Sequence, residues 1–176
     1  MPSIFILMGI KHCGKTTIGK ILSTAMKIDF IDLDDEVEKQ YSPDRNLSFR
    51  KIYQKLGREG FSHLETAALR KLYTEISKPF ILSLGGGTVE NSKAVAILKK
   101  SGFKIYLKEE ELTLYKRILS NGLPPFLDSS DPGQQFHALY LKRDSMYTAL
   151  ADLTVKLEGR NPAAAAEAVR SAIKTV

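Results

Sequence analysis

Eight residues near the start of the chain, Gly9 to Thr16, have the types and spacing of a phosphate-binding loop. They read GIKHCGKT and fit the pattern G-x-x-x-x-G-K-[ST]. Gly9 and Gly14 let the backbone curl so that successive N–H groups face a phosphate, and Lys15 is expected to neutralise charge on the β- and γ-phosphates. The Thr16 hydroxyl is expected to ligate Mg²⁺, which prefers oxygen ligands. The sequence therefore predicts a nucleoside triphosphate site.

The variable positions of this loop are expected to contribute backbone rather than side chains. His12 and Cys13 are therefore counted among the nucleotide-binding positions for their backbone alone. Thr17, the next residue after the motif, is included in the same stretch and is expected to cap the following helix or to pack against it. Cys13 is the only cysteine of the sequence, so an internal disulfide is impossible.

A cluster of carboxylates ends the next apolar segment, residues 28 to 36, which read IDFIDLDDE. Strand alternation places Asp32 and Asp34 on the same side at the end of this segment, where open α/β sheets bind their ligands. One carboxylate can hold the water shell of a metal, and the other can orient or deprotonate an acceptor hydroxyl. Asp35 is assigned to capping the helix that begins at Glu36, although capping is a common role that Asp34 could also fill.

A run of three glycines, Gly85 to Gly87, follows a third apolar segment in the stretch SLGGGT. Glycines allow the backbone to approach a ligand closely and expose several N–H donors. A plain turn needs only one glycine. The run is therefore interpreted as part of the site rather than as a simple bend.

The elements that must position these residues alternate along the chain. Buried strands are predicted at residues 3–8, 28–33, from 79, at 102–108 and, more weakly, at 151–157. Helices are predicted from Lys15 and Glu36 and at about 48–57, 59–77, 91–100, 110–120, 135–149 and 163–175. This order indicates an α/β fold with a parallel sheet covered on both faces, in a single domain of 176 residues.

Composition excludes some classes of function. The net charge of +6 attracts anions of any kind, but lysines and arginines are dispersed with no block of five, which argues against nucleic acid as the ligand. No window holds 18 consecutive apolar residues, and the first residues, MPSIFILMG, lack the pattern of an export signal. We therefore expect a cytoplasmic protein that neither spans nor binds a membrane.

Taken together, these motifs resemble shikimate kinase, a member of the nucleoside monophosphate kinase group of phosphate-loop folds. The resemblance covers nearly the whole chain and rests on GIKHCGKTT, FIDLD, SLGGG, KR at 116–117, LKRDSMY at 141–147 and GRNP at 159–162. It implies a three-layer α/β/α kinase domain over residues 1–176 with a five-stranded parallel sheet and a lid. It also implies MgATP-dependent phosphorylation of the 3-hydroxyl of shikimate in aromatic amino acid biosynthesis, by a monomer.

The resemblance also implies a role for each matching residue. Lys15 contacts the phosphates, while Thr16 directly and Asp32 through water hold Mg²⁺. Asp34 binds the acceptor hydroxyls and, with Lys15, is catalytic. Helices at about 34–77 are expected to bind the acceptor. Gly85, Gly86 and Gly87 contact the acceptor, and Arg143 pairs with its carboxylate. Arg117, Arg160 and Pro162 bind adenine.

Two positions depart from the family pattern. The substrate helix usually begins FRxxE, with its arginine on the acceptor carboxylate, but this chain has Ser62 after Phe61. Arg58 lies one helical turn earlier, so we expect Arg58, or alternatively His63, to reach the same carboxylate.

The second departure lies in the expected lid, residues 121–134, which contains NGLPPFLDSSDPG. Pro124 stands where the family usually has an arginine, and these thirteen residues contain no arginine or lysine. Gly122 and Gly133 are candidate hinges. The lid is expected to exclude water, while stabilising charge must come from elsewhere, such as Lys116 or Arg117.

These departures leave two other functions open. One is a related small-molecule kinase with a different hydroxylated acceptor, which loss of the acceptor-carboxylate arginine would favour. The other is a nucleotide-binding paralogue with little catalysis, which loss of the lid arginine would favour. Retention of Lys15, Thr16, Asp32 and Asp34 argues for an active kinase.

Overall fold

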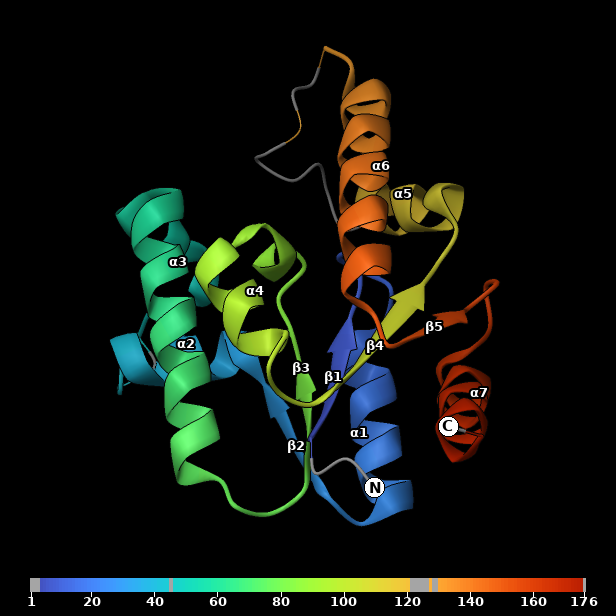
Figure 1. The fold of residues 1–176 in the computed structure, drawn as a ribbon. Coiled ribbons are helices and arrows are strands. Elements are labelled where there is room, and N and C mark those ends of the chain that lie inside the picture. Colours follow the sequence, from blue (N-terminus) through green and yellow to red (C-terminus); the bar gives the residue numbers. More distant parts are fainter. Residues whose placement is uncertain (1–3, 45, 121–126, 128–129, 176) are drawn as a thin grey trace.

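A computed structural model describes residues 4–44, 46–120, 127 and 130–175 of the chain (Figure 1). Five parallel strands form one sheet in the order β2-β3-β1-β4-β5. The strands are β1 (Ile4–Met8), β2 (Asp29–Asp32), β3 (Phe80–Ser83), β4 (Phe103–Lys108) and β5 (Leu153–Lys156). The helices are α1 (Lys15–Met26), α2 (Leu33–Tyr41), α3 (Phe49–Glu75), the short 3₁₀ helix η1 (Thr88–Glu90), α4 (Ser92–Leu98), α5 (Glu111–Ser120), α6 (Pro132–Leu150) and α7 (Pro162–Lys174).

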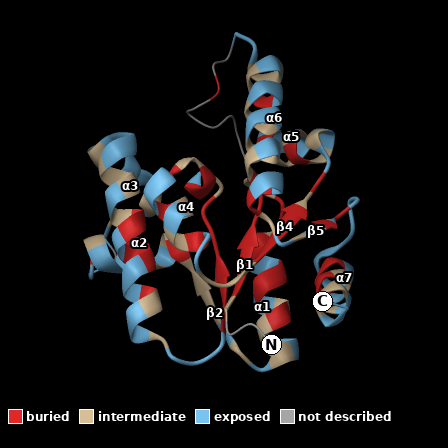
Figure 2. Ribbon diagram, in the orientation of Figure 1, coloured by how far each residue is buried: buried red, intermediate tan, exposed pale blue. Residues whose placement is uncertain are grey.

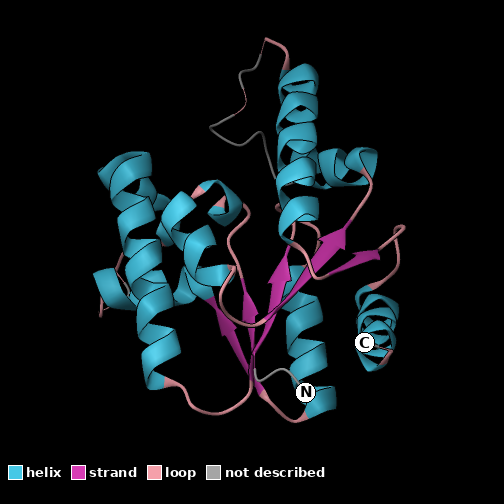
Figure 3. Cartoon of the chain, viewed as in Figure 1, coloured by secondary structure: helices cyan, strands magenta, loops and turns pink. Residues whose placement is uncertain are grey.

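The central strands are buried on both faces because their side chains are apolar in succession rather than in alternation. All four residues of β3 are buried, as are four of the five residues of β1. Figure 2 shows these strands in red at the centre of the molecule, between helices whose outer surfaces are exposed. A parallel sheet that needs such cover requires helical crossovers, which the alternation of elements provides (Figure 3). The predicted parallel sheet is therefore confirmed.

The strand register brings the ends of three strands together at one edge. Ser83 is the register partner of both Asp32 in β2 and Leu7 in β1. The loops that leave β1, β2 and β3 therefore start side by side at the carboxyl ends of the strands. Ligands of open α/β sheets bind in this position.

Helix α3 is bent at Gly57, whose φ of 67° and ψ of −174° interrupt its helical geometry. A Cβ at this position would meet no atom within 4 Å, so the conformation rather than space calls for glycine. The two helices predicted at 48–57 and 59–77 are the two halves of this bent helix. Its second half packs against α4, and α1 lies beside α7 (Figure 1).

Two helices begin three residues earlier than predicted, and the predicted cap at Asp35 is wrong. Helix α2 begins at Leu33, and its capping residue is Asp32, whose side chain accepts a hydrogen bond of 3.1 Å from the Asp34 N–H. Asp35 lies inside the first turn, so it is not the cap. Helix α6 begins at Pro132 under an Asp131 cap, so residues 132–134 of the predicted lid are helical and Gly133 lies in the first turn.

The predictions for Gly122, Pro124 and most of the lid fall on residues 121–126, 128 and 129, outside the described part of the chain. Within the described residues, no helix has the length and apolar character needed to cross a membrane.

Candidate active site

The phosphate loop connects β1 to α1 and is closed tightly on itself. A Cβ at Gly9 would lie 2.7 Å from the Cys13 sulfur and 2.8 Å from the Leu107 carbonyl oxygen in β4, so only glycine fits there. Gly14 is the N-cap residue of α1 and has a φ of 98°, in the left-handed region. His12 also has positive φ, 68°, and Cys13 is buried. The tight course of this loop therefore depends on glycine at positions 9 and 14.

Lys15 folds back across this loop. Its ammonium group donates to the carbonyl oxygens of Gly9 at 2.8 Å and Ile10 at 3.3 Å, and the residue is 8% exposed. The positive charge is thus held within the loop that would surround a phosphate. Thr17, by contrast, is exposed and does not cap α1, so the expectation that it caps or packs is wrong.

The two predicted metal ligands, Thr16 and Asp32, are in direct contact. The Thr16 hydroxyl donates to Oδ2 of Asp32 at 2.8 Å, while Oδ1 of Asp32 caps α2. The cap fixes the Asp32 carboxylate at the end of β2, facing the first turn of α1. A hydroxyl and a carboxylate are hard oxygen donors that suit Mg²⁺, which takes few protein ligands and completes its shell with phosphate oxygens and water.

Asp34 lies two residues further on, against the glycine run. A Cβ at Gly85 would be 2.8 Å from Oδ1 of Asp34 and 3.2 Å from the Thr88 hydroxyl oxygen. Burial, with the neighbouring charges of Asp32 and Glu65, raises the pKa of Asp34 to about 7, and Lys15 only partly offsets this. The same side chain is therefore poised between its neutral and ionised forms near neutral pH.

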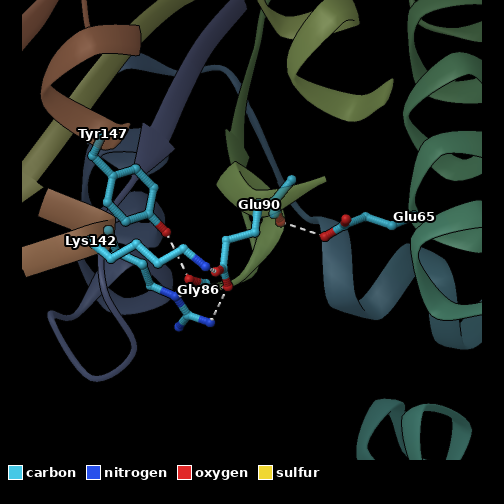
Figure 4. A network of polar contacts seen from close by, with 7 residues as sticks. Glu65, Gly86, Glu90, Lys142 and Tyr147 are labelled. Carbon is cyan, nitrogen blue, oxygen red and sulfur yellow. Dashed lines mark hydrogen bonds and ion pairs between the residues drawn. The ribbon is translucent and has the colours of Figure 1, made fainter. Parts of the chain in front are cut away.

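The other two glycines touch the phosphate loop and α6. A Cβ at Gly86 would lie 3.0 Å from the Lys11 backbone nitrogen, and one at Gly87 would lie 3.5 Å from Nη2 of Arg143. Tyr147 of α6 donates its hydroxyl to the Gly86 carbonyl oxygen at 2.9 Å (Figure 4). The structure thus brings together Asp34, the glycine run, the phosphate loop and Arg143.

Arg143 is held by a carboxylate from the end of η1. Its Nη2 and Nε groups donate to Oε2 of Glu90 at 2.8 and 3.3 Å, and Lys142 donates to Oε1 of the same residue at 2.5 Å. Figure 4 shows Lys142 and Glu90 pointing toward each other beside Gly86 and Tyr147. Burial opposes ionisation of Glu90, but the two basic residues outweigh it and keep the pKa of this carboxyl below its usual range.

A buried network behind the glycine run was not predicted from the sequence. Glu65 of α3 accepts from the Thr88 hydroxyl at 2.5 Å and from the Asn91 side-chain amide at 2.9 Å. Burial raises the pKa of Glu65 despite these two hydrogen bonds. The network fixes η1 against α3. Its signal in the sequence is the position of Glu65 at the end of the FxxxE segment that begins at Phe61.

Arg58, Ser62 and His63 line one cleft of about 330 Å³ between α3 and the start of α4. Glu90 lies on the same cleft. Arg58 is exposed, and the Ser62 position is partly buried. The structure therefore brings Arg58 and His63 to the cleft where Ser62 stands, with Glu90 between this cleft and Arg143.

The predicted adenine residues come from two elements linked by a carboxylate that the sequence analysis missed. Glu109, 2% exposed, pairs with Arg117 of α5 at 3.2 Å and accepts at 3.0 Å from the Gly159 N–H in the loop before α7. Arg117 also donates to the His12 carbonyl oxygen at 3.1 Å. Arg160 and Pro162 follow Gly159, with Arg160 donating to the Lys156 carbonyl oxygen and pairing with Glu158. Glu109 therefore joins α5 to the loop that carries Arg160.

Comparison with known proteins gives one consistent family. A family model described as shikimate kinase matches residues 11–174. The shikimate kinase of Thioalkalivibrio sulfidiphilus is 35% identical over 153 residues, covering 87% of this chain and 77% of that protein. The shikimate kinase of a Marinomonas species is 31% identical over 173 residues, covering 98% of this chain and 92% of that protein.

A solved structure agrees with these sequence matches. Shikimate kinase from Acinetobacter baumannii in complex with shikimate superposes with a TM-score of 0.87 at 26% identity, covering 99% of this chain and 94% of that one. The predicted phosphate-loop kinase fold is confirmed. Since the family model matches almost the whole chain and its motifs meet at one edge of this fold, the chain belongs to the shikimate kinase family.

Proposed function

We propose that Asp34 is the residue that accepts the proton when this chain phosphorylates the 3-hydroxyl of shikimate. Members of the family transfer a phosphoryl group from ATP to an alcohol group of shikimate and use Mg²⁺. The observation that carries the proposal is the position of the Asp34 carboxylate against Gly85, with a pKa of about 7. A base with such a pKa is mostly ionised at slightly alkaline pH yet still takes up a proton readily.

The nucleotide side of the site has a different task. Lys15 and the N–H groups of the phosphate loop would bind the β- and γ-phosphates, where Lys15 already lies within the loop. Thr16 and Asp32 would hold Mg²⁺, which neutralises developing charge on the transferred group. The capping hydrogen bond holds the Asp32 side chain in one rotamer, so little side-chain entropy would be lost when it orients this ion.

The acceptor side would bind shikimate between Asp34, Gly85 to Gly87 and Arg143. The guanidinium of Arg143 suits a carboxylate because it presents paired N–H donors. Arg58 lines the neighbouring cleft and would supply longer-range attraction for the same anion. Arg117, Arg160 and Pro162 would enclose the adenine, with the part of the expected lid that precedes α6 excluding water.

We further infer a cytoplasmic monomer that binds no nucleic acid and no membrane. The dispersed positive charge and the family resemblance support this inference. Light scattering of the purified protein at micromolar concentration tests the oligomeric state, and a dimer mass would contradict it.

A coupled assay of ADP release tests the function. Purified protein with MgATP should turn over with shikimate, and Asp34→Asn should lower kcat by about 100-fold or more, the range of a lost general base. Asp35→Asn, one residue along and exposed, is the matched control and should stay near the wild-type rate. Turnover with gluconate or a nucleoside monophosphate in place of shikimate would instead support a kinase with another acceptor. Nucleotide binding without turnover on any acceptor would support the weakly catalytic paralogue.

A further inference from the structure

The guanidinium of Arg143 already holds a carboxylate from its own chain. Glu90 binds it through Nη2 and Nε, at 2.8 and 3.3 Å, so one edge of the guanidinium is occupied. Both side chains are largely screened from water, with exposed fractions of 16% for Arg143 and 13% for Glu90. In such surroundings a charged pair is weakened little by solvent, and its partners separate only when something replaces the lost contact.

This pair lies within the site proposed for the acceptor. Nη2 of Arg143, which makes the shorter contact with Glu90, is also the atom that approaches Gly87. An acceptor carboxylate would have to take the edge that Glu90 occupies or lie beside Glu90 at like charge. Either arrangement costs binding free energy.

We propose that Glu90 sets the affinity and selectivity for the acceptor by competing with the acceptor's carboxylate for Arg143. The inference rests on the proposed function, because it takes a carboxylate-bearing acceptor as the ligand. In the free protein Glu90 is the internal occupant of Arg143. When the acceptor binds, the Glu90 carboxylate leaves Arg143.

The cleft beside Glu90 offers a place for the displaced carboxylate. Arg58 and Lys93 line it together with Glu90, and Lys142 can keep its own contact with Oε1. This gives Arg58 a role that differs from direct contact with the acceptor: it receives Glu90 when Arg143 is taken. Displacing Glu90 breaks the Arg143–Glu90 ion pair, and only an acceptor with its own carboxylate can replace that pair. A neutral acceptor therefore gains no binding free energy from Arg143.

Glu90→Gln tests the inference by removing the competing charge while keeping the shape of the side chain. If Glu90 occupies Arg143 in about nine of ten molecules, the apparent affinity for the carboxylate is reduced about tenfold. The KM for shikimate should therefore fall by up to about tenfold in Glu90→Gln, with the KM for ATP within about twofold. The methyl ester of shikimate, which lacks the charge, should show the same KM in both proteins.

Glu59→Gln is the matched control. Glu59 lines the same cleft and the substitution changes the net charge equally, so it reports any general electrostatic effect on an anionic acceptor. Glu90→Asp is a second variant, because its shorter side chain should hold Arg143 less well and give an intermediate KM. Titration with ATP checks that each variant keeps a folded nucleotide site.

The outcomes separate the two proposals. Turnover by the wild type with an unchanged or raised KM in Glu90→Gln overturns the inference alone, and a raised KM would mean that Glu90 positions Arg143 for the acceptor. An equal fall in KM for Glu59→Gln, or for the methyl ester, also overturns it. No shikimate-dependent turnover in either the wild type or Glu90→Gln overturns the proposed function and the inference with it.

Discussion

Asp32 and Asp34 are two residues apart, yet the backbone gives them different surroundings. Asp32 is the last residue of β2. Its Oδ1 accepts the hydrogen bond that caps α2, and its Oδ2 accepts a hydrogen bond from the Thr16 hydroxyl, so both carboxylate oxygens are engaged. Asp34 lies in the first turn of α2, partly buried against Gly85 and near the carboxylates of Asp32 and Glu65. One carboxylate is thereby suited to hold a cation and the other to exchange a proton.

The pH dependence of catalysis should follow Asp34. Its carboxyl must be ionised to accept the hydroxyl proton, and burial with nearby negative charge raises its pKa to about 7. We expect kcat/KM for shikimate to rise with pH to a plateau, with a midpoint near 7, and to fall about tenfold per pH unit below it. Initial rates between pH 5.5 and 9 measure this profile. A plateau that extends down to pH 5 would remove Asp34 from the role of base.

At this scale, sequence patterns identified the residues whose neighbours lie close in the chain. The phosphate loop could be predicted because its glycines, Lys15 and Thr16 all lie within one stretch of eight residues, Gly9 to Thr16. The Asp32 cap was missed because Asp32, Asp34 and Asp35 are chemically equivalent for this role, and only the geometry at the end of β2 selects one. Glu90 gave no signal because its partner is 53 residues away.

Helix α5 and the loop before α7 are joined by a single buried carboxylate. Glu109 accepts a hydrogen bond from the Gly159 N–H through Oε1 and forms an ion pair with Arg117 through Oε2. Arg117 in turn reaches the phosphate loop at His12. The side of the site expected to hold adenine therefore depends on a residue that need not touch the nucleotide.

Replacing this carboxylate should weaken nucleotide binding specifically. In Glu109→Gln the hydrogen bond from Gly159 can persist, but the amide cannot pair with the Arg117 charge. We expect the KM for ATP to rise by about five- to tenfold, which corresponds to about 1–1.4 kcal/mol, with the KM for shikimate unchanged. Steady-state kinetics with each substrate varied in turn measure this.

Glu110→Gln, at the adjacent and exposed position, serves as the control and should leave both constants near their wild-type values. A parallel rise in the KM for both substrates would show that Glu109 supports the whole fold rather than the adenine side.

Most elements could be predicted because each carries its own periodicity, but their ends could not. The start of α6 at Pro132 depends on the Asp131 cap, whereas the sequence reads as turn formers up to Gly133. The bend in α3 was predicted as a break because glycine marks it. The strand order, which brings β3 between β1 and β2, results from packing of distant segments and has no local signature.

For the molecule as a whole, the raised pKa of Asp34 has a cost in stability. Between about pH 4 and pH 7 the unfolded chain has released this proton while the folded protein retains it, so stability falls as pH rises through this window. Asp34→Asn removes the cost. We expect the variant to be more stable than the wild type at pH 8, on the order of 2 kcal/mol, which raises Tm by about 5 °C.

Thermal melts followed by circular dichroism at pH 8 and pH 5 measure this difference. The gap in Tm between the two proteins should narrow at pH 5, where Asp34 is protonated in the folded wild type and its charge is no longer buried. A gap of equal size at both pH values would attribute the stabilisation to something other than the buried charge.

The glycine run also limits which relatives of this sequence can exist. A side chain at Gly85 would have to displace the Asp34 carboxylate, and one at Gly86 would press against the Lys11 backbone, while the space beside Gly87 permits ordinary contact with Arg143. Since none of the three has a positive φ, the preference for glycine at Gly85 and Gly86 is one of space alone. Tolerance to substitution should therefore differ along the run, with alanine accepted at Gly87 and disfavoured at Gly85 and Gly86. A library of alanine and serine replacements, selected for shikimate turnover, should recover that gradient.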